Sequence, residues 1–415
     1  MIGPWTIGAQ LSTSHSSLAA LDEQRMFDIV RRVLEALDLD LLIIGFREAP
    51  EVFRRFCAPH RPVDNVYLWF SALSDINGMT EDNLVVNWRG ARSRGWGGWA
   101  EKGGDVEETF RFACPNNPAV REKTTLRLRE LLIRYDFKGV FLDKIRFPSP
   151  ANGADEMLSC FCDHCRRAAN AQGLDLGAVV RIFGDGDLIF GDGDLAANGL
   201  SLRGSSPGNW LGSIAAANPL LARFLAFRAV SVARLVGDLA NECRHLGRSV
   251  TLDLFSPSLA QLVGQDYQRL KGCCDWVKPM TYRLARGPAG LRLEVPALIE
   301  GVAQRFGLDE AQIVEWAARH ASFDQNMLRQ TREEAVPFTF MQREIEAAVR
   351  AMTPVPVYFG LELVSQPGVI DVTPADVIGM IETGHAANAA GLVISWDLLH
   401  APMEGLRALA ESGKF

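Results

Sequence analysis

The chain has 415 residues, 48% of them hydrophobic and 22% charged, with a formal net charge of −7. So much apolar surface can be buried in a core, which excludes a mostly disordered chain. Mild acidity without Lys/Arg tracts argues against nucleic acid or an anionic membrane as partner, and no apolar run approaches the ~18 residues of a spanning helix. The first residues lack the pattern of a secretory signal, so we expect a cytoplasmic protein or a trimmed secreted one; the oligomeric state stays open.

Eight short apolar segments stand out, and most are rich in Val, Ile, Leu or aromatics, as buried parallel strands are. They are Trp5–Leu11, Leu39–Phe46, Asn65–Ala72, Gly139–Asp143, Ser249–Phe255, Trp276–Tyr282, Pro356–Glu362 and Gly391–Asp397. Helical patterns lie between them, as in Gln24–Leu37, Pro118–Tyr135, Leu220–Leu246 and Val377–Ala390. Strand–helix alternation repeated eight times predicts a (β/α)8 TIM barrel, with a doubly wound open sheet as the alternative.

The chain is longer than a bare barrel needs, and the excess follows three of the strands. Residues 73–117 follow the third strand, 144–216 the fourth and 283–354 the sixth; the last segment looks helical in Leu298–Phe306 and Asp309–Arg319. Loops after strands lie at the carboxyl end of a barrel, where barrel enzymes place their sites. We therefore expect one catalytic domain, residues 1–415, with insertions around its active site.

Three cysteines form a compact metal-binding pattern, Cys160-x-Cys162-x2-Cys165. Tetrahedral zinc needs a fourth ligand, and Cys114, in the loop after the neighbouring strand, is the best candidate, ahead of His164. This spacing resembles the structural zinc cluster of the zinc-containing bacterial β-galactosidases, which are barrel glycosidases. Four cysteines leave no open coordination position, so the expected zinc is structural; free thiols and a disulfide are the alternatives.

The most informative stretch runs from Tyr135 to Pro148, preceded by Asn117-Pro-Ala-Val-Arg121. It resembles the "N-P-x-V-R … Y-D-x-x-G-(V/I)-x-x-D-x-I-R-F-P" pattern of a broad group of glycoside-hydrolase barrels. The segment Asp275-Trp-Val-Lys-Pro-Met-Thr-Tyr282 resembles their sixth strand. The resemblance spans roughly residues 110 to 282 and implies a barrel that acts on an oligo- or polysaccharide.

Glycoside hydrolysis needs two carboxyl groups at the scissile bond, and several predicted strands end in one. Asp143 ends the fourth strand, where we expect the nucleophile. The loose analogy with amylase-like barrels gives Asp253 as the acid/base and Glu362 as a third carboxylate, although Phe141 stands where those enzymes carry an Arg. For the acid/base, Asp253 ranks ahead of Glu362, with Asp397 behind.

Sugar sites combine aromatic rings with polar groups that bind hydroxyls. Aromatic residues at strand ends or in the loops beyond them are Trp69, Trp88, Trp96, Trp99, Tyr282, Tyr358 and Trp396. Polar candidates are Gln10, Arg47, Asn116, Arg146, Lys278, Asp397 and His400. Lys278 would suit an acidic or sulfated sugar, or simply pair with Asp143 or Asp253.

Two other functions compete with a glycosidase. A metal-dependent sugar enzyme is disfavoured because only seven His occur and none lies in an H-x-H or H-E-x-x-H pattern. A non-catalytic glycan-binding barrel would differ in lacking a second acid near Asp143. The repeat Phe-Gly-Asp-Gly-Asp at 183–187 and 190–194 is read as an acidic turn pair rather than a calcium site.

Overall fold

The computed structural model describes residues 5–14, 22–75, 78–102, 108–185, 218–320 and 323–412. Most of the Gly-Asp-Gly-Asp repeat and the side chain of Trp99 lie outside this part of the chain, so the expectations for them are not addressed.

Eight parallel strands form the centre of the molecule, in the sheet order β6-β5-β4-β3-β2-β1-β8-β7. A parallel bridge between Val277 and Val357 joins β6 to β7 and closes the sheet into a barrel. The prediction of a (β/α)8 barrel is therefore confirmed, and the open-sheet alternative is wrong. The strands are β1 Thr6–Ser12, β2 Leu41–Gly45, β3 Asn65–Ser71, β4 Gly139–Asp143, β5 Ser249–Phe255, β6 Trp276–Met280, β7 Tyr358–Glu362 and β8 Gly391–Ser395.

Two cores hold the barrel together. A large outer core packs alternate strand residues against the surrounding helices, whereas a smaller inner core of bulky side chains fills the barrel. Trp69 and Phe141 belong to the inner core. Because side chains alternate along a strand, Ser71 and Asp143, two residues further on, point to the same inner side at the carboxyl end.

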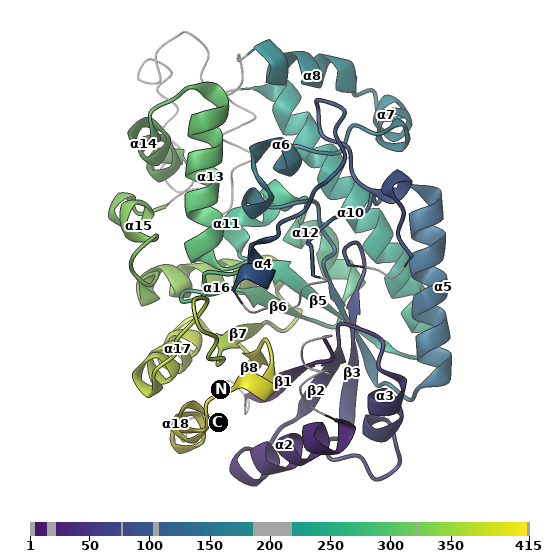
Figure 1. Ribbon diagram of the computed structural model, residues 1–415, viewed down its shortest axis with the longest axis vertical. Helices are drawn as coiled ribbons and strands as arrows, with labels where there is room; N and C mark the ends of the chain where they lie inside the picture. The colour runs from purple at the N-terminus through teal and green to yellow at the C-terminus, as the bar shows by residue number, and fades with distance from the viewer. Residues whose placement is uncertain are drawn as a thin grey trace.

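Helices follow the strands and cover the barrel (Figure 1). Local sequence fixes where several begin: Asn117 and Asn218 accept backbone N–H bonds as caps, and each precedes a Pro in the first turn. The helices are α2 Glu23–Ala36, α3 Pro50–Phe56, α4 Gly98–Glu101, α5 Pro118–Arg134, α6 Ala154–Met157, α7 Asp163–Asn170, α8 Leu176–Asp185, α10 Pro219–His245, α11 Pro257–Ala260, α12 Tyr267–Leu270, α13 Leu291–Phe306, α14 Glu310–His320, α15 Gln325–Gln330, α16 Phe338–Met352, α17 Pro374–Ala386 and α18 Met403–Glu411.

The segments after β4 and β6 add helices at the carboxyl end of the barrel. Figure 1 shows α6, α7, α8, α13 and α14 together above the barrel, far from α2 and α18. Helix α13 packs against α6 and against the 3₁₀ turn Pro150–Asn152, so the segments after β4 and β6 touch. No described helix combines the length and apolarity needed to cross a bilayer.

Candidate active site

A cavity of about 830 Å³ opens at the carboxyl end of the barrel. Strand ends and the loops beyond them supply its lining, as the barrel architecture predicts. Eight of the eleven predicted catalytic and substrate-binding residues line it: Gln10, Trp69, Asp143, Arg146, Asp253, Tyr282, Trp396 and Asp397. Lys278 lies directly behind this lining, in contact with Gln10, Asp253 and Tyr282.

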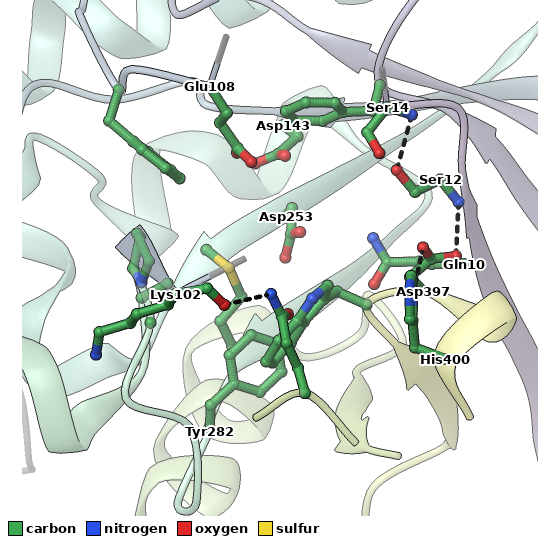
Figure 2. A pocket seen from close by; sticks show the side chains of 18 of the residues that line it. Gln10, Ser12, Ser14, Lys102, Glu108, Asp143, Asp253, Tyr282, Asp397 and His400 are labelled. Atoms are coloured by element: carbon green, nitrogen blue, oxygen red, sulfur yellow. Dashed lines mark hydrogen bonds and ion pairs between the residues drawn. The ribbon is translucent and has the colours of Figure 1, made fainter. Parts of the chain in front are cut away.

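Two of the carboxylates come from neighbouring strands. Leu142 of β4 pairs with Leu252 of β5, so Asp143 and Asp253, the next residue on each strand, stand side by side. Adjacent strands are about 4.8 Å apart, and both side chains line the same cavity from these neighbouring positions. Figure 2 shows the Asp253 carboxyl group between Asp143 and the Tyr282 ring.

Asp143 is held by two N–H donors. Trp69 Nε1 donates to its Oδ2 at 2.9 Å, and the backbone N–H of Lys144 donates to its Oδ1. These two hydrogen bonds fix the orientation of the Asp143 carboxyl group. Only 8% of Asp143 is exposed, at the cavity.

Asp253 lies deeper and has a different environment. It is 3% exposed, and its Oδ2 pairs with Lys278 Nζ at 3.1 Å. Among the described residues its Oδ1 has no hydrogen-bond partner. Burial raises the pKa of Asp253 to about 8; the Lys278 ammonium opposes this shift, and the Asp143 carboxylate adds to it. A carboxyl group with a pKa raised to about 8 is suited to donate a proton, and the neighbouring Asp143 is suited to contact the reacting carbon.

Lys278 organises the floor of the site. Its Nζ donates to Gln10 Oε1 and to the Tyr282 hydroxyl, each at 2.8 Å, and lies 3.4 Å from Ser395 Oγ. Of the alternatives raised for Lys278, the structure shows an ion pair with Asp253. Gln10 Nε2 is left without a partner among the described residues, on the cavity side of this network.

Two predicted site residues lie elsewhere. Glu362 is fully buried, and its carboxylate accepts the backbone N–H groups of Arg283, Leu284 and Ala285 at 2.7 to 3.1 Å. Burial raises the pKa of Glu362 to about 7, with those N–H donors opposing the shift. It anchors the loop after β6 and does not line the cavity. Asn116 donates to Cys165 Sγ and to Ser231 Oγ, so it lies at the cysteine cluster.

The aromatic candidates also divide. Trp69, Tyr282 and Trp396 line the cavity, together with Phe46, Phe110 and Phe255, which the sequence did not single out. Tyr358 packs on Trp276 inside the barrel. Trp88 packs against Phe183 and donates to Asp155, and Trp96 packs on Phe110.

The rim contains further charged residues, of which the sequence analysis passed over Lys144 and Glu108. Lys144 directly follows Asp143 with φ +52°, and its Nζ pairs with Asp75 at 2.6 Å and Glu108 at 2.9 Å. These ion pairs join the loops after β3 and β4. Asp397, at the opposite side in Figure 2, accepts from the Ser12 N–H and from His400, whose pKa it raises. Adjacency to Asp143 is the sequence signal that would have found Lys144.

A separate cluster brings together all four predicted metal ligands. The Sγ atoms of Cys114, Cys160, Cys162 and Cys165 lie within 4.8 Å of one another, and none forms a disulfide. Cys114 Sγ is 3.4 Å from Cys165 Sγ and 3.5 Å from Cys162 Sγ. Four thiolates at 2.3 Å from a zinc ion are about 3.8 Å apart, so this cluster fits a tetrahedral metal. The Val86 N–H donates to Cys160 Sγ and the Asn116 amide to Cys165 Sγ, contacts that orient the sulfurs.

No family model matches the chain, and no curated protein matches it. Among solved structures, the glycoside hydrolase domain of PgaB (BpsB) from Bordetella bronchiseptica is similar over 94% of this chain and 99% of its own, with 11% identity and a TM-score of 0.44. A chitinase from Chromobacterium violaceum matches over 99% of both chains, with 9% identity and a TM-score of 0.45.

The catalytic domain of a β-amylase from Paenibacillus polymyxa matches over 98% of this chain and 97% of its own, with 8% identity and a TM-score of 0.48. The activities in these names are those of the three solved proteins. At such identities and TM-scores we draw no function from the likeness, and the barrel assignment stands on the strand order and closure described above.

Proposed function

We propose that this protein is a glycoside hydrolase that cleaves an oligo- or polysaccharide, with Asp143 as nucleophile and Asp253 as acid/base. One observation carries the proposal: two carboxyl groups from adjacent strands face an aromatic-lined cavity of about 830 Å³. Burial, which raises the pKa of the deeper one to about 8, suits that group to donate a proton. The pair satisfies the basic chemical requirement of glycoside hydrolysis.

In the proposed reaction, Asp253 donates its proton to the leaving oxygen while Asp143 attacks the anomeric carbon. Proton donation leaves a negative charge on Asp253, and the Lys278 ammonium at 3.1 Å stabilises it. Water then attacks the anomeric carbon and displaces the Asp143 carboxylate, while Asp253 takes up a proton from that water. Lys278 thus acts through Asp253 as a positioning residue.

The cavity also offers contacts for a sugar ring. Gln10 Nε2 is an unpartnered buried donor among the described residues and suits a hydroxyl group. Trp69, Tyr282 and Trp396 provide flat apolar faces, and the Tyr282 and Trp396 rings lie 5.9 Å apart at 55°. Asp397, anchored by Ser12 and His400, adds a rigid acceptor.

We further propose that the four-cysteine cluster holds one structural zinc ion. It joins the loop after β3, through Cys114, to the insertion after β4, which also packs on α10. A zinc with four thiolate ligands has no open position for substrate, so its contribution would be to stability. Elemental analysis of the purified protein should find about one zinc per chain.

We propose that residues 1–415 act as one catalytic unit, with 144–216 and 283–354 as insertions.

The proposed activity is tested by incubating the protein with aryl glycosides and natural glycans and measuring released phenol or reducing ends. Release above the buffer control supports the proposal and names the sugar. If the protein binds glycans on an array but releases nothing from any of them, the cavity belongs to a glycan-binding barrel and the hydrolase proposal fails.

A further inference from the structure

One cation in the cavity differs from the others. Arg146 is 3% exposed and lines the cavity, yet it forms no ion pair with any carboxylate among the described residues. Its one described hydrogen bond runs from Nη1 to the Phe147 carbonyl at 3.0 Å. A guanidinium group has five N–H donors, so most of its capacity is unused by these protein partners.

The neighbouring cations are paired. Lys144 pairs with Asp75 and Glu108, and Lys278 pairs with Asp253 while donating to Gln10 and Tyr282. An unpaired buried charge is costly, because it has lost its hydration without gaining a counter-ion. Burial accordingly lowers the pKa of Arg146 to about 10, although Glu294 and other carboxylates oppose the shift; the group remains charged at neutral pH.

Arg146 is also rigidly held. Its guanidinium lies over the rings of Phe112 at 4.3 Å and Phe255 at 4.5 Å, so two aromatic faces cover it. Stacking of this kind fixes the guanidinium plane and leaves its N–H edge for a ligand. Glu294, the carboxylate with the largest favourable effect on Arg146, is occupied by Ser149, Ala151 and Ala289.

The position of Arg146 relates it to the proposed reaction. It follows Asp143 by three residues, and both Asp143 and Asp253 act electrostatically on it. An anion bound there would belong to the sugar at the scissile bond or next to it. A neutral sugar would give the Arg146 guanidinium no charged acceptor in direct contact, whereas a carboxylate accepts two parallel N–H bonds from a guanidinium.

We propose that Arg146 binds an oxyanion of the substrate, so that the cavity selects acidic sugars carrying a uronic-acid carboxylate or a sulfate ester. This inference rests on the proposed glycosidase function and deepens it by naming the substrate class. Charge-assisted hydrogen bonds of this type correspond to a preference of about 10- to 100-fold over the matched neutral sugar.

Binding, rather than turnover, tests the inference. Glucuronate, galacturonate and mannuronate are titrated by calorimetry or tryptophan fluorescence against glucose, galactose and mannose, with glucose 6-sulfate as the sulfate probe. The proteins are wild type, Arg146→Met, Arg146→Lys and, as a matched control, Arg54→Met, which removes an exposed charge on α3. We expect at least one acidic sugar to bind about 10-fold more tightly than its neutral counterpart in wild type and Arg54→Met, and equally in Arg146→Met.

If Arg146→Met does not fold, Arg146→Lys decides the matter: it keeps the charge but loses the fork, so the preference should fall at least about threefold. A preference for glucose 6-sulfate alone assigns the oxyanion to a sulfate ester. No preference for any acidic sugar in wild type, or one unchanged in the folded variants, overturns the inference. If the protein cleaves neutral glycans and binds no acidic sugar preferentially, only this inference fails. If it binds acidic sugars preferentially but cleaves no glycan, only the proposed hydrolysis fails.

Discussion

Replacing Asp253 with Asn should remove the proton donor while keeping the shape of the site. With a pKa raised from 3.8 to about 8, roughly nine in ten Asp253 side chains are protonated at pH 7, against fewer than about one in a thousand at the ordinary value. An acid of this kind contributes about 10²- to 10⁴-fold to the rate. Asp253→Asn should therefore lower kcat/KM on natural glycans by that factor.

Two readouts separate acid catalysis from a structural effect. The dinitrophenolate of a dinitrophenyl glycoside is a good leaving group that needs no proton from the enzyme. Asp253→Asn should therefore keep far more activity on dinitrophenyl glycosides than on natural glycans. The wild-type kcat/KM should fall as the pH rises through about 8, because Asp253 is active only while protonated, and the variant should lose this alkaline limb. Equal losses on both substrates, or an alkaline limb that persists in the variant, would refute the role of Asp253.

Three further predictions follow from the same geometry. Because Asp143 is proposed to attack the anomeric carbon itself, proton NMR should show the product first with the substrate's anomeric configuration; inversion would contradict the nucleophile role. Glu362→Gln should lower the free energy of unfolding by about 1–3 kcal/mol, measured by denaturant titration, with kcat little changed, because it anchors backbone N–H groups; lost turnover at unchanged stability would contradict this. Cys162→Ser should lose zinc and lower Tm, whereas Cys57→Ser, a half-buried thiol outside the cluster, should do neither; equal effects would argue against a metal cluster.

The barrel could be predicted from the sequence because its strands are buried on both faces. Near-continuous apolar runs such as Leu41–Gly45 and Gly391–Ser395 are typical of parallel strands, and caps such as Asn117 mark where helices begin. Cysteine spacing was equally informative, because a thiolate cluster depends on a few local contacts between two adjacent loops.

The roles of the strand-end carboxylates were harder to read. Asp143, Asp253 and Glu362 all end or lie near the end of a strand, and their local sequences do not separate them. What separates them is the loop after β6, whose backbone N–H groups at 283–285 close over Glu362 and remove it from the cavity. Long-range loop packing of this kind has no local sequence signature.

Local position explains two of the misplaced residues, one polar and one aromatic. Asn116 is close in sequence to Cys114 and turns toward the cysteine cluster instead of the cavity. Tyr358 begins its strand rather than ending it, so its ring lies inside the barrel against Trp276; its place in the strand could have shown this. Glu108, which the sequence analysis did not name, lines the cavity and pairs with Lys144 from the next loop.

The most direct test of the central claim compares wild type with Asp143→Asn in one hydrolysis screen, with Asp136→Asn as the matched control. Asp136 is an exposed Asp just before β4, paired with Arg61 and Arg248, and lies outside the cavity. We predict sugar release by wild type and Asp136→Asn, and none by a folded Asp143→Asn. Near wild-type release by Asp143→Asn would contradict the account.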